Sequence, residues 1–373
     1  MAPARLPISL LTGFLGSGKT TLLNALIRHP EAGTLAVIIN EFGEIGLDHD
    51  LVAKTDDETV LLSGGCLCCT VKGELIETLA RLYARRAKGE VPPFDRVLIE
   101  TTGLADPTPI LQALILDPTV AAQFVLDGVI TTIDAVNGLA TLDGHELAVK
   151  QAAVADRLLL TKTDLADAER LSKLHARLGI INPGTDPVHV VQGEIAPGHL
   201  FGVGIYDPAS KHPDVQTWLN AEAYGPEAQR RGRHDAHGHD HDHEHHHHGH
   251  DHGHHDHSHD VNRHDDHIKA FCITYDKPIR LDALAGWLDT MLMLRGRDML
   301  RIKAILNLEG EDKPAVLHGV QEIFHPLVSL DAWPDEDRRS RIVFITRDMD
   351  PSFLEATLKE FNEGTPADAP APA

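Results

Sequence analysis

The residues with the clearest chemical pattern lie near the start of the chain, at Gly13 to Thr20. Their sequence, GFLGSGKT, fits the phosphate-binding pattern G-x-x-x-x-G-K-[ST] at every fixed position. In such a loop the backbone N–H groups face the phosphates, the lysine reaches the β- and γ-phosphates, and the Ser or Thr hydroxyl binds Mg²⁺. We therefore predict a nucleoside triphosphate site with Lys19 and Thr20 also catalytic, Thr20 as the Mg²⁺ ligand, and binding residues Gly13, Gly16, Ser17, Gly18, Lys19, Thr20 and Thr21.

A carboxylate and a glycine downstream would complete the hydrolytic part of this site. The apolar run at 96–100 ends in Glu100 and is followed by Gly103, which resembles a Walker B element. Glu100 would act on Mg²⁺ through water or orient the attacking water, and the N–H of Gly103 would contact the γ-phosphate. The alternative for Glu100 is an ordinary turn or capping carboxylate.

The segment Thr161-Lys162-Thr163-Asp164 is close to N-K-x-D, the tetrad with which GTPases read guanine. Asp164 would accept hydrogen bonds from the guanine N1–H and 2-amino group, and the stem of Lys162 would cover the ring. Adenine lacks these donors, so Asp164 favours GTP over ATP. Thr161 replaces an asparagine whose amide usually ties this loop to the phosphate loop. We expect that tie to be lost, which leaves strict use of GTP open.

Three of the four cysteines, Cys66, Cys68 and Cys69, lie too close together in the sequence for an ordinary disulfide framework. They come directly before a predicted helix at 70–88, whose N-terminus favours the thiolate that binds metals or acts as a nucleophile. Two or three sulfurs would reach one ion, and other ligands would complete a tetrahedron. An exchangeable metal site is favoured, with redox or sensing thiols and inert cysteines as the alternatives. Cys272, in an alternating strand pattern, reads as a small buried hydrophobe.

A histidine-rich stretch forms the second conspicuous feature of the chain. Seventeen of the 26 histidines lie between His234 and His267, interrupted mostly by Asp and Gly. Too few apolar residues are present for this stretch to fold, so we predict a disordered internal linker. Its imidazoles and carboxylates would bind several Zn²⁺, Ni²⁺, Co²⁺ or Cu²⁺ ions, with an affinity that falls as the histidines are protonated. A solvated spacer that binds metal incidentally is the alternative.

The elements that must position these residues alternate between strand and helix in the first half of the chain. We predict strands at 8–12, 35–40, 59–62, 96–100, 125–134, 157–161 and 187–191, and helices at 21–28, 70–88 and 146–155. This order predicts an α/β fold, a P-loop NTPase with a doubly wound, mainly parallel sheet, over residues 1–200. Strands at 268–275, 301–308, 315–324 and 341–346, with helices at 281–294 and 351–361, predict a smaller α+β domain at 268–363. Residues 201–267 would be the linker and 364–373 a disordered tail.

The composition limits the classes of partner that the protein could bind and the cellular compartment in which we expect it. The formal net charge is −22, and no basic patch interleaved with aromatic residues is present, which argues against nucleic acid or an anionic membrane as a partner. Neither a secretion signal nor a run of about 20 apolar residues is found, so we expect a cytoplasmic protein with reduced thiols.

The chain resembles the CobW-like GTPases, relatives of the accessory GTPases that deliver nickel to urease and hydrogenase. The resemblance spans nearly the whole chain and is carried by TGFLGSGKTTLLN, NEFGEIGLD, GGCLCC, ETTGLADP, TKTD, LRIKAILNLEG, GVQEIF and RIVFITRD. It implies a metal chaperone in which Mg²⁺-GTP orders the switch loops, the thiolates bind a transition metal, and hydrolysis loosens the site for handover to a client metalloprotein or metal-insertion pathway. Members of the family use the three cysteines as the metal site, here Cys66, Cys68 and Cys69, with Glu44 as an extra ligand.

Zinc is expected ahead of cobalt, because thiolate and imidazole ligands suit Zn²⁺ and ligand affinities favour it over Co²⁺. Two other functions stay open: a nucleotide-gated metal buffer or sensor with no dedicated client, and an ATP-dependent kinase that acts on a small molecule. A second copy of the chain, in a homodimer, is kept among the candidate partners.

Overall fold

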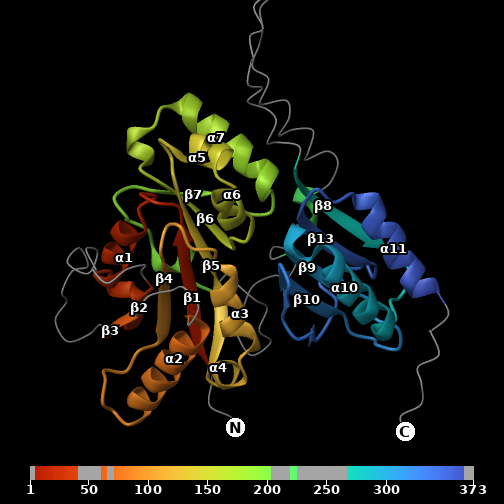
Figure 1. Ribbon diagram of the computed structural model, residues 1–373, viewed down its shortest axis with the longest axis horizontal. Coiled ribbons are helices and arrows are strands. Elements are labelled where there is room, and N and C mark those ends of the chain that lie inside the picture. The colour runs from red at the N-terminus through yellow and green to blue at the C-terminus, as the bar shows by residue number, and fades with distance from the viewer. Residues whose placement is uncertain (1–4, 41–59, 65–70, 203–218, 225–266, 365–373) are drawn as a thin grey trace, which may run out of the picture.

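The computed structural model describes residues 5–40, 60–64, 71–202, 219–224 and 267–364, which form two domains side by side (Figure 1). The first domain is built on a seven-stranded sheet in the order β3-β2-β4-β1-β5-β6-β7, and every pairing in it is parallel. Its strands are β1 (Leu6–Gly13), β2 (Leu35–Asn40), β3 (Val60–Gly64), β4 (Arg96–Thr101), β5 (Phe124–Asp134), β6 (Arg157–Thr161) and β7 (Val188–Val190).

Helices cover both faces of this sheet, which explains why its strands are apolar without alternation. Leu10 on β1 packs into a core with α2 and α3, whereas its neighbour Leu11 packs into the opposite core with α1. The doubly wound α/β prediction is therefore confirmed. The helices are α1 (Lys19–Ile27), α2 (Val71–Ala87), α3 (Thr108–Leu116), α4 (Pro118–Gln123), α5 (Gly138–Gly144), α6 (Glu146–Ala153) and α7 (Ala168–Ile181).

The second domain is an antiparallel sheet in the order β11-β10-β9-β13-β8, with β12 pairing with β10. Its elements are β8 (Ile268–Tyr275), α10 (Leu281–Arg295), β9 (Met299–Leu306), β10 (Ala315–Val320), β11 (Ile323–Phe324), β12 (Val328–Ser329), β13 (Ser340–Arg347) and α11 (Pro351–Glu363). The single strand predicted at 315–324 is wrong. Gln321 lies between β10 and β11 with a left-handed φ of 53°, which an uninterrupted strand does not contain.

The second sheet uses one face for its own helices and the other for the first domain. Ile302 and Phe344 pack in the core under α10 and α11. Ile305 and Val343, on the opposite face, share a core with residues of α6 and α7. Figure 1 accordingly shows the second domain beside α3, α6 and α7. The domain boundary is thus crossed by a continuous hydrophobic core.

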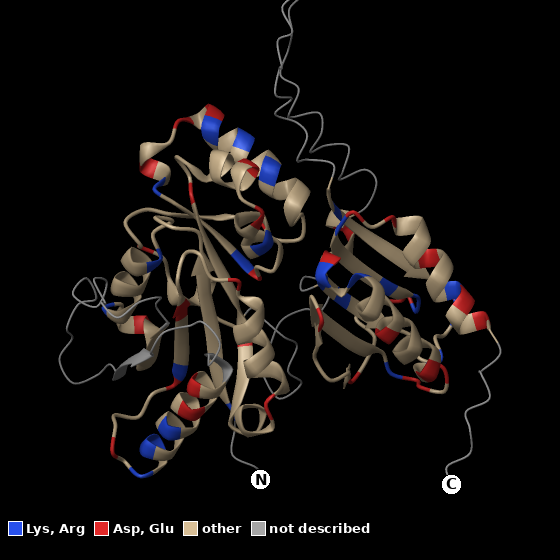
Figure 2. Cartoon of the chain, in the orientation of Figure 1, with Lys and Arg blue, Asp and Glu red and all other residues tan. Residues whose placement is uncertain are grey.

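Charged side chains are interspersed on the exposed helices. Figure 2 shows basic and acidic residues following one another along α2 and α7 in this view. Such mixing is typical of a solvated helix surface. Among the described residues, the helices are all too short or too polar to cross a lipid bilayer.

A buried polar cluster lies within the shared core. Arg301 of β9 forms an ion pair with Asp156 and donates hydrogen bonds to the carbonyl oxygens of Val154 and Ala155. Asp156 also accepts a hydrogen bond of 2.9 Å from the N–H of Val129. These contacts join the second domain to the segment between α6 and β6.

Two histidines beside this cluster are held neutral. The rings of His318 and His325 stack with their centroids 5.1 Å apart. Burial lowers the pKa of His318 well below its ordinary value and that of His325 to about 4, although Asp156 acts in the opposite direction on His325. Burial and the nearby Arg301 also lower the pKa of Lys303 to about 7.

We predict that the free energy of unfolding falls between pH 6.5 and pH 4. In this window unfolded His325 is protonated and folded His325 is not, so the unfolded state binds more protons and lowering the pH favours it. The loss is about 2 kcal/mol at pH 5 for this residue alone. Thermal unfolding as a function of pH should therefore show a smaller slope for His325→Gln than for the wild type. The matched control is His199→Gln, at an exposed site, and equal slopes for all three chains would contradict the prediction.

Candidate nucleotide-binding site

The predicted site residues follow the carboxyl ends of neighbouring strands. Gly13 ends β1, Glu100 lies at the end of β4, and Thr161 ends β6. Because these strands are parallel, their carboxyl ends lie at the same edge of the sheet, where α/β proteins bind their ligands.

The phosphate loop, residues 13–20, has a backbone that only glycine can form at its start. Gly13 has a φ of 138°, and a β-carbon there would lie 2.4 Å from the carbonyl oxygen of Thr132. Gly18 has a φ of 90° and caps the N-terminus of α1. The helix therefore begins at Lys19, two residues before the predicted start, and its N-terminus points at the predicted phosphates.

Lys19 and Thr20, the residues predicted to bind the phosphates and Mg²⁺, are the first two residues of α1. Lys19 is buried, and its Nζ donates to the carbonyl oxygens of Gly13 at 2.7 Å and Phe14 at 3.1 Å, which holds the ammonium within the loop. The hydroxyl of Thr20 lies 3.3 Å from Oε1 of Glu100. Hydroxyl and carboxylate oxygens are the ligands Mg²⁺ prefers. This pair therefore fits the ion, with Glu100 as a direct ligand or acting through water.

Two other predicted binding residues of the loop differ in exposure. Ser17 is buried, and its hydroxyl lies 2.7 Å from that of Thr132. Its side chain thus points into the protein, and its backbone N–H donates to the carbonyl oxygen of Phe14 at 3.2 Å. Thr21 is exposed on the first turn of α1.

Gly103 lies directly against the phosphate loop. A β-carbon at this residue would lie 2.6 Å from the backbone nitrogen and 2.7 Å from the Cα of Leu15. The loop after β4 and the phosphate loop thus lie so close that their backbones are in contact. This proximity agrees with the predicted contact of Gly103 with the γ-phosphate.

Thr161 differs from our expectation. Its hydroxyl donates to the carbonyl oxygen of Ser17 at 2.8 Å, so the tie to the phosphate loop is kept by a hydroxyl in place of an amide. Gly18 is adjacent, and a β-carbon on it would meet the Thr161 side chain at 3.3 Å. The predicted loss of this tie is wrong because the shorter side chain starts close enough to reach. Asp164 is exposed at the same edge.

Lys162 links the segment at 161–164, which is predicted to read the base, to the phosphate loop and to Asp134, a residue that the sequence did not single out. Its Nζ donates to the carbonyl oxygen of Gly16 at 2.8 Å and to Oδ2 of Asp134 at 2.7 Å. Burial alone would raise the pKa of Asp134, but hydrogen bonds from Lys162, Asn137 and Val136 outweigh it and lower that pKa. Asp134 therefore stays charged and fixes the lysine. The signal for it was its place at the end of the predicted strand 125–134.

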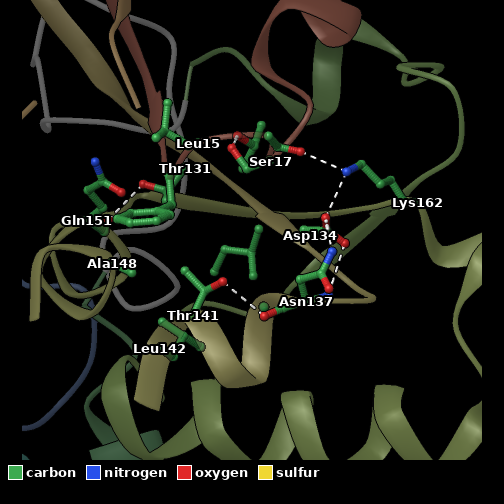
Figure 3. Close-up of a pocket in the computed structure, with 15 residues that line it drawn as sticks. Leu15, Ser17, Thr131, Asp134, Asn137, Thr141, Leu142, Ala148, Gln151 and Lys162 are labelled. Carbon is green, nitrogen blue, oxygen red and sulfur yellow. Dashed lines mark hydrogen bonds and ion pairs between the residues drawn. The ribbon is translucent and has the colours of Figure 1, made fainter. Parts of the chain in front are cut away.

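A cavity of about 170 Å³ lies beside the phosphate loop (Figure 3). Leu15 and Ser17 line one side, Thr141 and Leu142 of α5 line the other, and Lys162 reaches across to Asp134. This volume is below the roughly 300–1,000 Å³ of most small-molecule sites. The cavity is therefore too small to hold a nucleotide by itself.

The predicted metal ligands Cys66, Cys68, Cys69 and Glu44 lie outside the described residues. Within the described ranges, no group of three or more His, Cys, Asp or Glu side chains could hold a metal ion. Cys272 is half-buried, and burial raises the pKa of its thiol to about 11, which agrees with an inert hydrophobic role.

Comparisons with known proteins extend over both domains. The family described as CobW/HypB/UreG, nucleotide-binding domain, matches residues 7–189, and the cobalamin synthesis protein cobW C-terminal domain matches residues 268–362. The zinc chaperone YjiA of Escherichia coli is 31% identical over 342 residues, which cover 91% of this chain and 93% of that protein. The zinc chaperone CobW of Pseudomonas aeruginosa is 31% identical over 388 residues, covering 95% and 91% respectively.

The fold is also found in a solved structure. The crystal structure of Zn(II)-bound YjiA GTPase from E. coli matches with a TM-score of 0.65 at 26% identity, covering 96% of this chain and 99% of that one. This match confirms the predicted P-loop NTPase fold with a separate C-terminal domain. Because both domains match in order and the likeness covers nearly the full length of these relatives, the chain belongs to the CobW family.

Proposed function

We propose that the protein is a GTP-hydrolysing metallochaperone that binds a transition metal at Cys66, Cys68 and Cys69 and delivers it to a client metalloprotein or metal-insertion pathway. One observation carries this proposal: the predicted nucleotide site and the strand that leads to the cysteines end at the same edge of the sheet. The hydroxyl of Thr20 lies 3.3 Å from Glu100 at this edge, and β3, which precedes the cysteines, ends there too.

The sheet register connects the cysteine segment with the nucleotide site. Gly64, the last residue of β3, pairs with Asn40 on β2, and Asn40 pairs with Thr101 on β4, directly after Glu100. The segment that carries the cysteines therefore begins at the same height in the sheet as the residue that follows Glu100. This placement supports a metal site that responds to the nucleotide.

In the nucleotide part, Lys19 would bind the β- and γ-phosphates and Thr20 would bind Mg²⁺. Glu100 would position Mg²⁺ or the attacking water, and Gly103 would contact the γ-phosphate. Asp164 would read guanine, while Thr161 and Lys162 hold the base-reading segment against the phosphate loop.

Zinc is the metal that the relatives favour, since two of them are named zinc chaperones and one structure is described as zinc-bound. Three thiolates provide the soft ligands that suit Zn²⁺, with Co²⁺ as the next candidate, and Glu44 would add a carboxylate. If GTP raises the affinity for the metal, the metal must raise the affinity for GTP by the same factor.

The proposal is tested by titrating Zn²⁺ and Co²⁺ with Mg²⁺ and a non-hydrolysable GTP analogue present or absent. Cys66→Ala and Cys68→Ala should each reduce the thiolate-to-cobalt absorption and weaken binding at least tenfold. Cys272→Ala is the matched control and should leave both unchanged. Absorption of unchanged intensity in both variants would refute the cysteine site. Equal binding of ATP and GTP in competition would refute the guanine preference.

A metal buffer or sensor is the second candidate, because seventeen histidines lie between His234 and His267. Deletion of residues 234–267 separates the two functions. A chaperone keeps one nucleotide-dependent thiolate site and still transfers Zn²⁺ to an acceptor, whereas a buffer loses most of its metal capacity.

A further inference from the structure

The loop at 102–107 joins β4 to α3 and contacts three parts of the molecule. On one side Gly103 abuts the backbone of Leu15 in the phosphate loop. On the other sides the loop is held by α6 and, through Thr108, by the second domain. The position of Gly103 relative to the phosphates therefore depends on these outer contacts.

Two consecutive residues of α6 hold this loop. The side-chain amide of Gln151 is almost fully buried, and its Nε2 donates to the carbonyl oxygens of Gly103 at 3.4 Å and Ala105 at 3.1 Å. Lys150 forms an ion pair of 2.6 Å with Asp106. Burial alone would raise the pKa of Asp106, but hydrogen bonds from Lys150 and Thr108 outweigh it and lower that pKa. The loop is thus fixed by charged and neutral hydrogen bonds.

The second domain reaches the same loop through one side chain. The hydroxyl of Thr108 lies 2.6 Å from Oδ1 of Asp106 and 2.9 Å from the side-chain amide of Gln321. A hydroxyl can donate only one hydrogen bond, and Thr108 donates it to the closer acceptor, the carboxylate of Asp106. The amide atom that faces the hydroxyl is Oε1 of Gln321. Turning the amide by 180° leaves its shape unchanged and lets Nε2 donate to the hydroxyl oxygen. Gln321 is buried, and its left-handed turn presents the amide to Thr108.

The second domain also contacts both ends of α6. Arg347 of β13 pairs with Glu146, the first residue of the helix, at 3.0 Å. Arg301 of β9 donates to the carbonyl oxygen of Val154, just after its last residue, at 2.8 Å. The helix whose middle holds the loop is therefore fixed at both ends by the second domain.

We propose that the C-terminal domain positions the loop at 102–107 for GTP hydrolysis, with Gln321 as a positioning residue that acts through Thr108 and Asp106. The inference rests on the GTP hydrolysis proposed above. A displacement of about 1 Å at a reacting centre can cost 10²-fold in rate, so a contact that fixes Gly103 affects turnover without touching the nucleotide.

Gln321→Gly tests this role in the full chain. The substitution removes the amide while glycine favours the left-handed backbone, so a loss of folding does not explain its effect. We expect kcat for GTP to fall three- to tenfold, with GDP affinity unchanged because GDP lacks the γ-phosphate. Hydrogen exchange at residues 102–108 should become faster. The matched control is Glu322→Ala at the exposed neighbouring position, which should change neither kcat nor the rate of hydrogen exchange.

A double-mutant cycle with Thr108→Val shows whether the two residues act through each other. In the double variant, kcat should fall no further than in the more affected single variant. Thr108→Ser keeps the hydroxyl and should therefore keep the wild-type kcat. A kcat for Gln321→Gly within twofold of the wild type, or losses that multiply in the double variant, would overturn the inference alone. A wild-type chain that does not hydrolyse GTP would contradict the proposed function and with it this inference.

Discussion

Replacing Arg301 by alanine is expected to lower the free energy of unfolding by about 3–5 kcal/mol. The side chains of Arg301 and Asp156 are 3% and 2% exposed, so the carboxylate would be left buried without its guanidinium partner. The carbonyl oxygens of Val154 and Ala155 would lose a donor as well. The Nζ of Lys303, which lies 3.8 Å from Oδ1 of Asp156, would be the remaining cation beside this carboxylate.

Urea or thermal unfolding at pH 7 measures this loss. Arg297→Ala is the matched control, because that side chain is 89% exposed and its ion pair with Glu322 is 4.0 Å long, so it should cost under about 0.5 kcal/mol. The double change Arg301→Met with Asp156→Leu removes both charges and should restore part of the stability. The N–H of Val129 and the two carbonyl oxygens still lose their side-chain partners. A loss below about 1 kcal/mol for Arg301→Ala would mean that water or Lys303 replaces the guanidinium at the interface.

The sequence predicted the first domain well because its elements carry local signals. The apolar runs of β1, β4 and β6 reflect burial on both faces, and the glycine pattern of the phosphate loop reflects φ values of 138° at Gly13 and 90° at Gly18. These requirements are encoded within a few residues. The phosphate loop, Glu100, Gly103 and the segment at 161–164 were found for this reason, and their binding and catalytic roles stay predictions.

Contacts that depend on distant pairing were not predictable in the same way. The contact of Thr161 with Ser17 joins residues 144 positions apart, and that of Thr108 with Gln321 joins residues 213 positions apart. The apolar runs of β9 and β13 show that both faces are buried, but not that one of them packs against α6 and α7. Polarity at a buried position, as at Arg301, is the signal that could have indicated a specific partner across the domains.

Substitution of Gly103 by alanine is expected to have the largest effect on turnover, a fall in GTP hydrolysis on the order of 10- to 100-fold. A β-carbon at this position would lie 2.6 Å from the backbone nitrogen of Leu15, closer than non-bonded atoms approach. The atoms that this β-carbon would meet belong to the backbone of Leu15 and not to the end of a flexible side chain. The phosphate loop and the loop after β4 must therefore move apart. Gly103 would then be displaced from the γ-phosphate.

Single-turnover hydrolysis with GTP and equilibrium binding of GDP distinguish this effect from general unfolding. GDP affinity should fall less than the rate, because Lys19 and the helix N-terminus, which are predicted to bind the β-phosphate, do not depend on Gly103. Gly179→Ala is the matched control: Gly179 lies in α7 with open space around it, so alanine should leave hydrolysis unchanged and stabilise the helix by roughly 0.5–1 kcal/mol. Hydrolysis at the wild-type rate by Gly103→Ala would mean that the two loops separate during turnover, and the close approach would then belong to another step of the cycle.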